Sequence, residues 1–254
     1  MSAPVLDVRS IEKRFGGVHA VADVSFSVAA GEMLALIGPN GAGKSTCFNL
    51  VNGQLRADGG EVRLAGRSLA GIAPRAIWRL GVGRTFQITA TFASMTVREN
   101  VQMALISHHR TLWSFLSRAA DKFRAEADAL LAQVGMAEQA ERPCGVLAYG
   151  DLKRLELAVA LANDPKLLLM DEPTAGMAPK ERTALMELTR GIVRARGLAC
   201  LFTEHDMDVV FGQADRILVM NRGRLIAEGT AETVRNDPAV REVYLGAGTT
   251  SGGH

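Results

Sequence analysis

One continuous run of residues has the types and spacing to bind a nucleotide phosphate: Gly38-Pro39-Asn40-Gly41-Ala42-Gly43-Lys44-Ser45-Thr46. It fits the pattern G-x-x-x-x-G-K-[ST] in full. The glycines allow backbone conformations closed to other residues, so consecutive N–H groups can turn toward phosphate oxygens. In this pattern the lysine reaches the β- and γ-phosphates and the next hydroxyl ligates Mg²⁺. The run therefore predicts a triphosphate site but leaves the reaction open.

Two acidic residues, Asp171 and Glu172, follow four apolar residues in Leu167-Leu168-Leu169-Met170. A buried strand that ends in carboxylates is typical of the Mg²⁺ side of a phosphate-loop ATPase. Asp171 would hold the metal, usually through water, and Glu172 would face the attacking water. The same pattern also fits a buried strand with a solvated acidic turn. Beside a phosphate loop we favour the functional interpretation.

A histidine, His205, follows another apolar run, Leu198 to Thr203. Open α/β sheets bind ligands at the carboxyl ends of their strands, so an imidazole there could contact a γ-phosphate. A lone histidine also fits an ordinary surface or capping position. His108 and His109 lie in a helical segment without such placement, and we expect them at the surface.

The elements that must position these residues alternate between strand and helix patterns. Short apolar runs predict strands over 33–37, 82–86, 167–170, 198–203 and 217–220, and helical patterns cover 179–196 and 206–212. This alternation indicates a mostly parallel, covered sheet. Alternating residues over 5–11 and 24–28, with a further strand over 61–65, predict a half-exposed sheet. A short helix is expected from Pro74 to Leu80.

A long stretch from Val97 to Leu161 has helical periodicity and no convincing strand pattern. Within it, Ala119 to Val134 places Phe123, Ala127 and Leu130 on one apolar face. We expect a helical insert in an α/β core. The last residues, 249–254, offer little to bury and are expected to form a loose tail.

Composition narrows the class of protein. The chain has 254 residues, of which 48% are hydrophobic and 22% charged, with a net charge of +2. That length suits one large domain or a core with a subdomain. The charge is too small to indicate a nucleic-acid partner or an anionic membrane surface.

The cysteine pattern, together with the expected lack of a signal peptide, indicates a reducing compartment. Cys47, Cys144 and Cys200 are odd in number and widely spaced, so they support neither a disulfide framework nor a zinc site. We expect no signal peptide at the start of the sequence, and no apolar run approaches the ~20 residues that span a bilayer. A cytoplasmic setting is therefore expected.

The order of motifs resembles that of the ATP-binding cassette (ABC) ATPases from about Val5 to Gly246. After the phosphate loop come Gln87, in Arg84-Thr85-Phe86-Gln87, and then the segment Leu147-Ala148-Tyr149-Gly150-Asp151. The acidic strand end and His205 follow. Other phosphate-loop proteins, such as GTPases and kinases, lack the 147–151 segment.

The resemblance implies a role for each matched residue. Phe15 would stack on adenine, and Gln87 would sense the metal and water at the contact with a membrane partner. Glu172 would be the catalytic base and His205 the switch on the γ-phosphate. The resemblance also implies a head-to-tail dimer in which the segment Ala148 to Asp151, which we call the signature segment, closes over the nucleotide of the other subunit.

Two segments depart from the family pattern. The usual L-S-G-G-Q signature reads Leu-Ala-Tyr-Gly-Asp, so Ala148 lacks a hydroxyl and Asp151 adds a negative charge toward phosphate. In Ala175-Gly176-Met177-Ala178 an alanine stands where the family normally carries Asp or Asn. Altered coupling of ATP hydrolysis follows as one hypothesis, and a non-hydrolysing regulatory module is the alternative.

A narrower resemblance concerns the subgroup. The segments Gly81 to Gln87, Glu204 to Met207, Ala227 to Thr230, Asp237 to Val240 and Tyr244 to Gly246 are similar to ATPase subunits of branched-chain amino acid importers. The same subgroup also handles amides, urea and aromatic acids, and its sequences resemble the lipopolysaccharide-export ATPase. A non-transport ABC ATPase normally needs a long coiled coil or a second cassette, which 254 residues do not accommodate.

The resemblance thus implies an α/β ABC ATPase, with a phosphate-loop core and an antiparallel β subdomain over about 5–90 and 163–246. A helical subdomain is expected over about 91–162 within one domain, 1–246, and a flexible tail over 247–254. The implied ligands are ATP and Mg²⁺. The implied partners are a second ABC ATPase, identical or different, two membrane permease subunits and, indirectly, an external solute-binding protein. The chain would then sit on the inner face of the membrane through the permeases.

Overall fold

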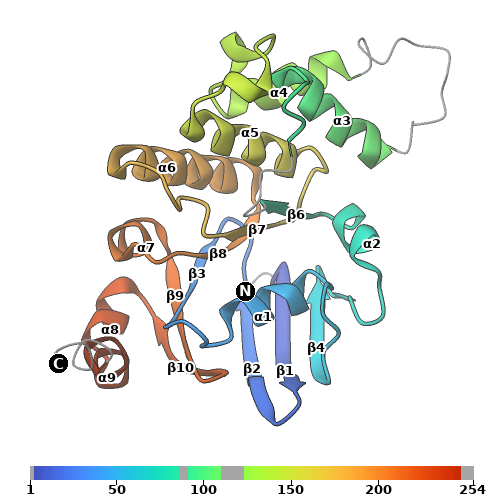
Figure 1. Cartoon of the computed structure of the whole chain (residues 1–254). Helices are drawn as coiled ribbons and strands as arrows, with labels where there is room; N and C mark the ends of the chain where they lie inside the picture. Colours follow the sequence, from blue (N-terminus) through green and yellow to red (C-terminus); the bar gives the residue numbers. More distant parts are fainter. Residues whose placement is uncertain (1–2, 86–90, 110–122, 247–254) are drawn as a thin grey trace.

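A six-stranded sheet forms the centre of the protein in the computed structural model, which describes residues 3–85, 91–109 and 123–246 (Figure 1). The strand order is β10-β9-β3-β8-β7-β6. Five strands are parallel, and β10 pairs antiparallel with β9 at one edge. The strands are β3 (Met33–Ile37), β6 (Val82–Thr85), β7 (Leu167–Asp171), β8 (Ala199–Thr203), β9 (Arg216–Asn221) and β10 (Arg224–Gly229).

A second sheet is antiparallel and has the order β2-β1-β4-β5. Its strands are β1 (Leu6–Phe15), β2 (Val18–Val28), β4 (Gly59–Leu64) and β5 (Arg67–Ser68). The pairing of β1 with β2 shifts register at several points, which bends the ribbon. In Figure 1 this sheet lies at the opposite end of the molecule from helices α3, α4 and α5.

Strand β3 separates two hydrophobic cores. Met33, Ala35 and Ile37 belong to the core beneath the helices, whereas Leu34 and Leu36 belong to the core shared with the antiparallel sheet. Because successive side chains on a strand point to opposite faces, a strand buried on both faces has a continuous apolar sequence. Helix α1 (Lys44–Val51) contributes Phe48 and Val51 to the second core. The phosphate loop is therefore anchored by a buried strand before it and a buried helix after it.

Helices cover the other face of the central sheet. Those before β7 are α3 (Val97–His109), α4 (Arg124–Gln133) and α5 (Tyr149–Leu161), with 3-10 segments at Ala137–Gln139 and Cys144–Val146, whereas α2 (Pro74–Arg79) buries Ile77 in the core shared with the antiparallel sheet. Those after β7 are α6 (Pro179–Arg196), α7 (Met207–Gln213), α8 (Ala231–Asn236) and α9 (Pro238–Gly246). None of the helices in the described ranges combines the length and apolar character needed to cross a membrane.

Helix α6 has clear start and stop signals. Pro179 occupies its first turn, and Gly197 ends it in a left-handed conformation with φ of 65°. Glu181 lies in the first turn and Arg194 and Arg196 in the last, so their charges complement the helix dipole. The helix therefore holds its N-terminal turn, including Arg182, in a defined place next to the loop that follows β7.

The fold class predicted from the sequence, a mostly parallel α/β core with an antiparallel β part and a helical part, is confirmed. The strands β3, β7, β8 and β9 lie where the apolar runs predicted them. The strand β10 and the helices α8 and α9 were not predicted. The helix expected from Ala119 begins at Arg124 within the described residues. The division into subdomains stays a prediction, and the tail 247–254 lies outside the described residues.

Candidate functional site

The phosphate loop joins the end of β3 to the start of α1. Gly38, Gly41 and Gly43 have φ of 151°, 78° and 104°, in the region that favours glycine. A Cβ on Gly43 would lie 2.2 Å from the carbonyl oxygen of Ala20, and one on Gly38 would lie 2.2 Å from that of Met220. The loop is therefore pressed against β2 and β9. No side chain caps the N-terminus of α1, so its first N–H groups face the loop without a side-chain acceptor.

Lys44 is folded back over the loop that precedes it. Its Nζ donates to the carbonyl oxygens of Gly38 at 2.6 Å and Pro39 at 3.1 Å. Burial lowers the pKa of Lys44, and the charges of Glu172 and Asp171 partly offset that effect. Phosphate oxygens are stronger acceptors for an ammonium than neutral carbonyls are. The ammonium group is thus held by two neutral carbonyl oxygens, which the phosphate oxygens of a bound nucleotide can replace.

A cavity of about 420 Å³ opens over the loop. Its lining combines the loop with residues from four other places in the sequence: Asn40 to Thr46, Val18, His19, Ala20, Glu172, His205 and Arg222. The structure thus brings Lys44, Glu172 and His205, which are far apart in the sequence, to one cavity. Its floor of glycines and backbone N–H groups is suited to anionic phosphate.

The acidic pair lies at the carboxyl end of β7. Thr203, at the end of the neighbouring strand β8, donates its hydroxyl to Asp171 Oδ1 at 2.7 Å. The backbone N–H of Glu172 donates to Thr203 Oγ1 at 3.0 Å. Glu172 itself has φ of 49°, a left-handed conformation that is costly for a residue with a Cβ. The turn therefore aims the Glu172 side chain away from the strand and toward the cavity.

His205 and Glu172 are in direct contact. His205 Nε2 lies 2.7 Å from Glu172 Oε1, and the two side chains are 53% and 27% exposed. A hydrogen bond of this kind orients a carboxylate and restricts its rotamers. The pair has the geometry of a base and the group that orients it, at the open side of the phosphate cavity.

The signature segment begins helix α5. Tyr149 is its first residue and Ala148 its N-cap, so Gly150 and Asp151 lie in the first turn. The Tyr149 hydroxyl donates to the carbonyl oxygen of Ala175 at 3.0 Å, which links the segment to the loop after β7 of the same chain. Among the described residues that line the phosphate cavity, none comes from 148–151. Within one chain, the signature segment therefore lies away from the phosphate cavity of that same chain.

Two further predicted site residues have different outcomes. Phe15 ends β1 directly opposite Val18, which lines the cavity, and the Phe15 residue is 49% exposed. Lys13 Nζ lies 5.7 Å from the centroid of that ring. An exposed aromatic face at the cavity rim is compatible with stacking on a base. Gln87 lies outside the described residues.

The residues near the loop fit a magnesium ion. Mg²⁺ is usually bound by one or two protein oxygens together with substrate phosphates and water. Ser45 lines the cavity, and the charge of Asp171, at the end of β7, is near enough to Lys44 to raise the pKa of that lysine. No group of three or more His, Cys, Asp or Glu residues suited to a metal occurs in the described ranges. This donor set suits an ion that is completed by the phosphates of its substrate.

The sequence patterns did not predict two parts of the cavity lining. The turn between β9 and β10 contains Arg222 and Gly223, both with positive φ, and Gly223 N donates to Ala42 O at 2.9 Å. A two-residue turn with Gly at its second position between apolar runs was a usable hairpin signal. The other part, Val18 to Ala20 in β2, carried no such signal because its pattern does not alternate regularly.

A phenol from the last helix also reaches the phosphate loop. Burial raises the pKa of Tyr244 to about 12, and a hydrogen bond from the Gly38 backbone partly offsets this rise. This effect of Gly38 on Tyr244 places α9 next to the first residue of the loop. Sequence periodicity over nine residues could not have indicated this contact.

Comparison with known proteins gives consistent matches. A family profile described as ABC transporter matches residues 21–175, and one described as branched-chain amino acid ATP-binding cassette transporter matches 224–249. The LivG protein of Escherichia coli K12, named a high-affinity branched-chain amino acid transport ATP-binding protein, is 42% identical over 97% of this chain and 99% of its own. BraF of Pseudomonas aeruginosa, with the same description, is 39% identical over 97% and 99%.

Solved structures agree with these matches. A crystal structure titled as the ADP conformation of an ATP-binding cassette of an ABC transporter has a TM-score of 0.85 and 32% identity, and it covers 96% of this chain and 100% of its own. A nucleotide-free cassette from an ABC transporter has a TM-score of 0.83 and 32% identity, with coverage of 95% and 99%.

Proposed function

Since this chain belongs to the ABC transporter family of ATPases, we propose that it is the ATP-hydrolysing subunit of an importer for branched-chain amino acids. The observation that supports branched-chain amino acids as the solute is the 42% identity to LivG across nearly the full length of both chains. The match of residues 224–249 to the branched-chain profile supports it independently of the phosphate loop.

In the proposed mechanism the backbone N–H groups of the cavity-lining part of the loop, residues 40–46, and the Lys44 ammonium bind the β- and γ-phosphates. Phe15 stacks on adenine. Ser45, Asp171 and Gln87 would hold Mg²⁺, which would neutralise the charge that develops on the phosphate. The cavity lining supports the assignments of Lys44 and Ser45, and the order of the motifs supports those of Phe15, Asp171 and Gln87.

Glu172 accepts a proton from the attacking water. His205 orients the Glu172 carboxylate through their hydrogen bond and also contacts the γ-phosphate. The support for this division is the 2.7 Å contact between His205 Nε2 and Glu172 Oε1 at the cavity. A positioned base contributes about 10²–10⁴-fold to such a step.

The signature segment of one subunit closes the ATP site of a second ABC ATPase subunit. Support comes from its position at an exposed helix N-terminus away from the cavity of its own chain. Its first-turn N–H groups and the helix dipole would meet the γ-phosphate across the interface. The second subunit is either another copy or a related chain.

Two permease subunits attach this dimer to the inner face of the membrane, and an external solute-binding protein delivers the amino acid to them. Deletion of the gene should abolish ATP-dependent uptake of leucine, isoleucine and valine by the parent cells. The wild-type gene should restore uptake, and the Glu172→Gln gene should not. Unchanged branched-chain uptake with loss of urea, amide or aromatic acid uptake, or of lipopolysaccharide export, would reassign the solute.

Gly150→Ala tests closure of the dimer. A Cβ at Gly150 would lie 3.4 Å from the Glu181 carboxylate, so alanine fits within one chain. We expect unchanged ATP binding by the monomer but at least a tenfold loss of ATP-dependent dimer, because a methyl group would separate the signature N–H groups from phosphate. Size-exclusion chromatography with ATP, in a Glu172→Gln background, measures this.

The matched control for closure is Gly191→Ala, a helical glycine of α6 whose Cβ would meet nothing within 4 Å. It should dimerise as the parent does. Equal dimer formation by Gly150→Ala and Gly191→Ala would contradict the proposed role of the signature segment.

A further inference from the structure

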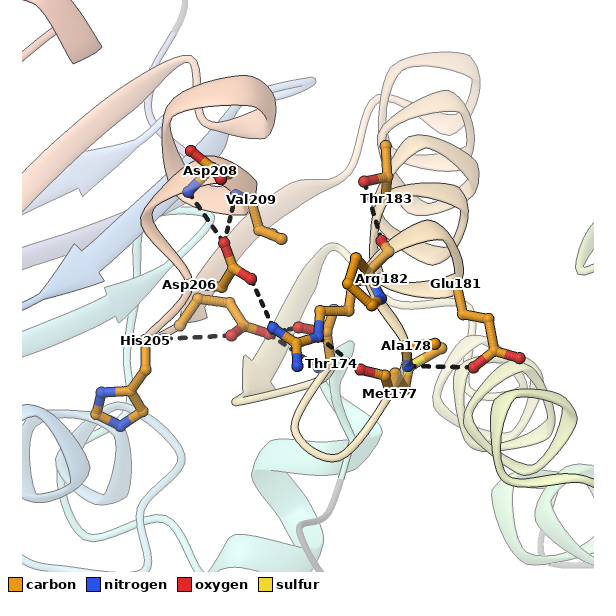
Figure 2. A network of polar contacts seen from close by, with 12 residues as sticks. Thr174, Met177, Ala178, Glu181, Arg182, Thr183, His205, Asp206, Asp208 and Val209 are labelled. Carbon is orange, nitrogen blue, oxygen red and sulfur yellow. Dashed lines mark hydrogen bonds and ion pairs between the residues drawn. The ribbon is translucent and has the colours of Figure 1, made fainter.

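His205 lies in the sequence between two carboxylates, Glu204, which bonds Thr174 of the loop after β7, and Asp206, which bonds Arg182 in the first turn of α6. The loop, residues 173–178, runs from the acidic strand end to α6, and Figure 2 shows Arg182 between Met177 of this loop and Asp206, the residue after His205. The His205 ring is half exposed and contacts Glu172. Because little packs against the ring, its place depends chiefly on the backbone on either side of it.

The carboxylate before His205 is buried. Glu204 is 4% exposed, and its Oε1 accepts from the Thr174 N–H at 2.8 Å and the Thr174 hydroxyl at 2.6 Å. Its Oε2 accepts from the His205 N–H at 3.2 Å. A buried carboxylate must be fully hydrogen-bonded to be stable. These three bonds fix the backbone at 204–205 to the start of the loop.

The carboxylate after His205 serves two partners. Asp206 Oδ1 accepts from the N–H groups of Asp208 and Val209 and caps α7, while Oδ2 lies 2.6 Å from Arg182 Nη1. The Val209 N–H and the Arg182 guanidinium are among the groups that hold the pKa of Asp206 below its usual value. Arg182 Nε also donates to the Met177 carbonyl oxygen at 2.7 Å. One guanidinium thus bonds both the end of the loop and the residue next to His205 (Figure 2).

We propose that Arg182 is a positioning residue for ATP hydrolysis, which acts by fixing the backbone of His205 relative to the loop 173–178. An ion pair of this exposure, with side chains 30% and 27% exposed, contributes little to the stability of the fold. A small displacement of a catalytic group can nevertheless lower a rate by about 10²-fold. Arg182 should therefore affect turnover far more than folding.

Helix α6 provides a matched control in Arg190. Its Nη2 lies 3.1 Å from Asp215 Oδ1 and its Nη1 donates to the Gly212 carbonyl oxygen at 3.3 Å, so it also joins a carboxylate to a carbonyl. The side chains of that pair are 30% and 29% exposed. Arg190 contacts the far end of α7 from His205. The two arginines thus make similar bonds and their side chains are equally exposed, but only Arg182 bonds a residue next to His205.

The test compares Arg182→Gln with Arg190→Gln in the full chain, by steady-state ATPase assay and thermal unfolding. Arg182→Gln should lower kcat about tenfold or more, with KM for MgATP within twofold of wild type and Tm equal to that of Arg190→Gln. Arg190→Gln should keep the wild-type kcat. Equal kcat values for the two variants would overturn the proposal.

A second variant keeps the test decisive if Arg182→Gln unfolds. Asp206→Asn retains an oxygen to cap α7 but removes the charge that pairs with Arg182. The same fall in kcat at unchanged KM supports the proposal, and wild-type kcat in Asp206→Asn overturns it.

The proposal rests on the proposed role of His205, which His205→Ala tests separately. If Arg182 acts through His205, Arg182→Gln should change the residual rate of His205→Ala by less than twofold, whereas a full tenfold effect there would overturn it. Wild-type turnover in His205→Ala would instead refute the role of His205. Loss of turnover in His205→Ala with wild-type turnover in Arg182→Gln would refute the positioning role alone.

Discussion

Replacing Glu172 with Gln should lower ATP turnover by about 10²–10⁴-fold while leaving ATP binding within a few-fold of wild type. Glutamine keeps the shape of the side chain and can keep the contact with His205 Nε2, which is 2.7 Å from Oε1. It cannot accept a proton from water. ATP should therefore remain intact in the closed site, and the dimer should accumulate.

Two measurements test this result. Phosphate release under steady-state conditions gives turnover, and size-exclusion chromatography with ATP and Mg²⁺ gives the dimer. Lys44→Ala serves as the comparison, since it should lose nucleotide binding as well as turnover. Wild-type phosphate release by Glu172→Gln would show that another group acts as the base.

Replacing Gly43 with Ala should weaken MgATP binding by roughly 100-fold or more, and it is the other change with a large expected effect. The new Cβ would lie 2.2 Å from the Ala20 carbonyl oxygen at a φ of 104°. Conformational strain and overpacking each cost about 1–3 kcal/mol, and a tenfold loss of affinity corresponds to about 1.4 kcal/mol. The loop would move from β2 and no longer present its N–H groups together.

Gly41→Ala is the matched control for this change. Gly41 also has a positive φ, 78°, but its Cβ would meet nothing within 4 Å. It should weaken binding less than Gly43→Ala, and the difference measures the contact with β2. Calorimetric titration with MgATP gives both affinities, and thermal unfolding shows whether either variant has lost its fold. Equal affinities would mean that this contact does not shape the loop.

The sequence was most informative where a single stretch of chain determines the structure. Strands β3 and β7 are buried on both faces, so their apolar runs identified them without reference to other segments. Strand β10 has no buried residue, and this sheet-edge strand lacks a regular alternation. Helix α8 has six residues, too few for a clear helical period. Such elements depend on tertiary contacts that local patterns do not encode.

The candidate site shows the same limit. Lys44, Asp171, Glu172 and His205 were identified from motifs, and their roles stay predictions. The bond between His205 and Glu172, and the approach of Gly43 to Ala20, depend on the order of strands in the sheets. Arg182 matched no motif and was recognised only from its bonds to Met177 and Asp206.

The left-handed backbone at Glu172 implies a trade between stability and activity. A non-glycine residue in this region costs about 1–3 kcal/mol, and glycine or asparagine would reduce that cost. Selection for thermal stability alone would therefore favour replacing the carboxylate, and only selection for turnover would retain it. In a directed-evolution experiment without a requirement for ATPase activity, position 172 should be among the first to lose its acid.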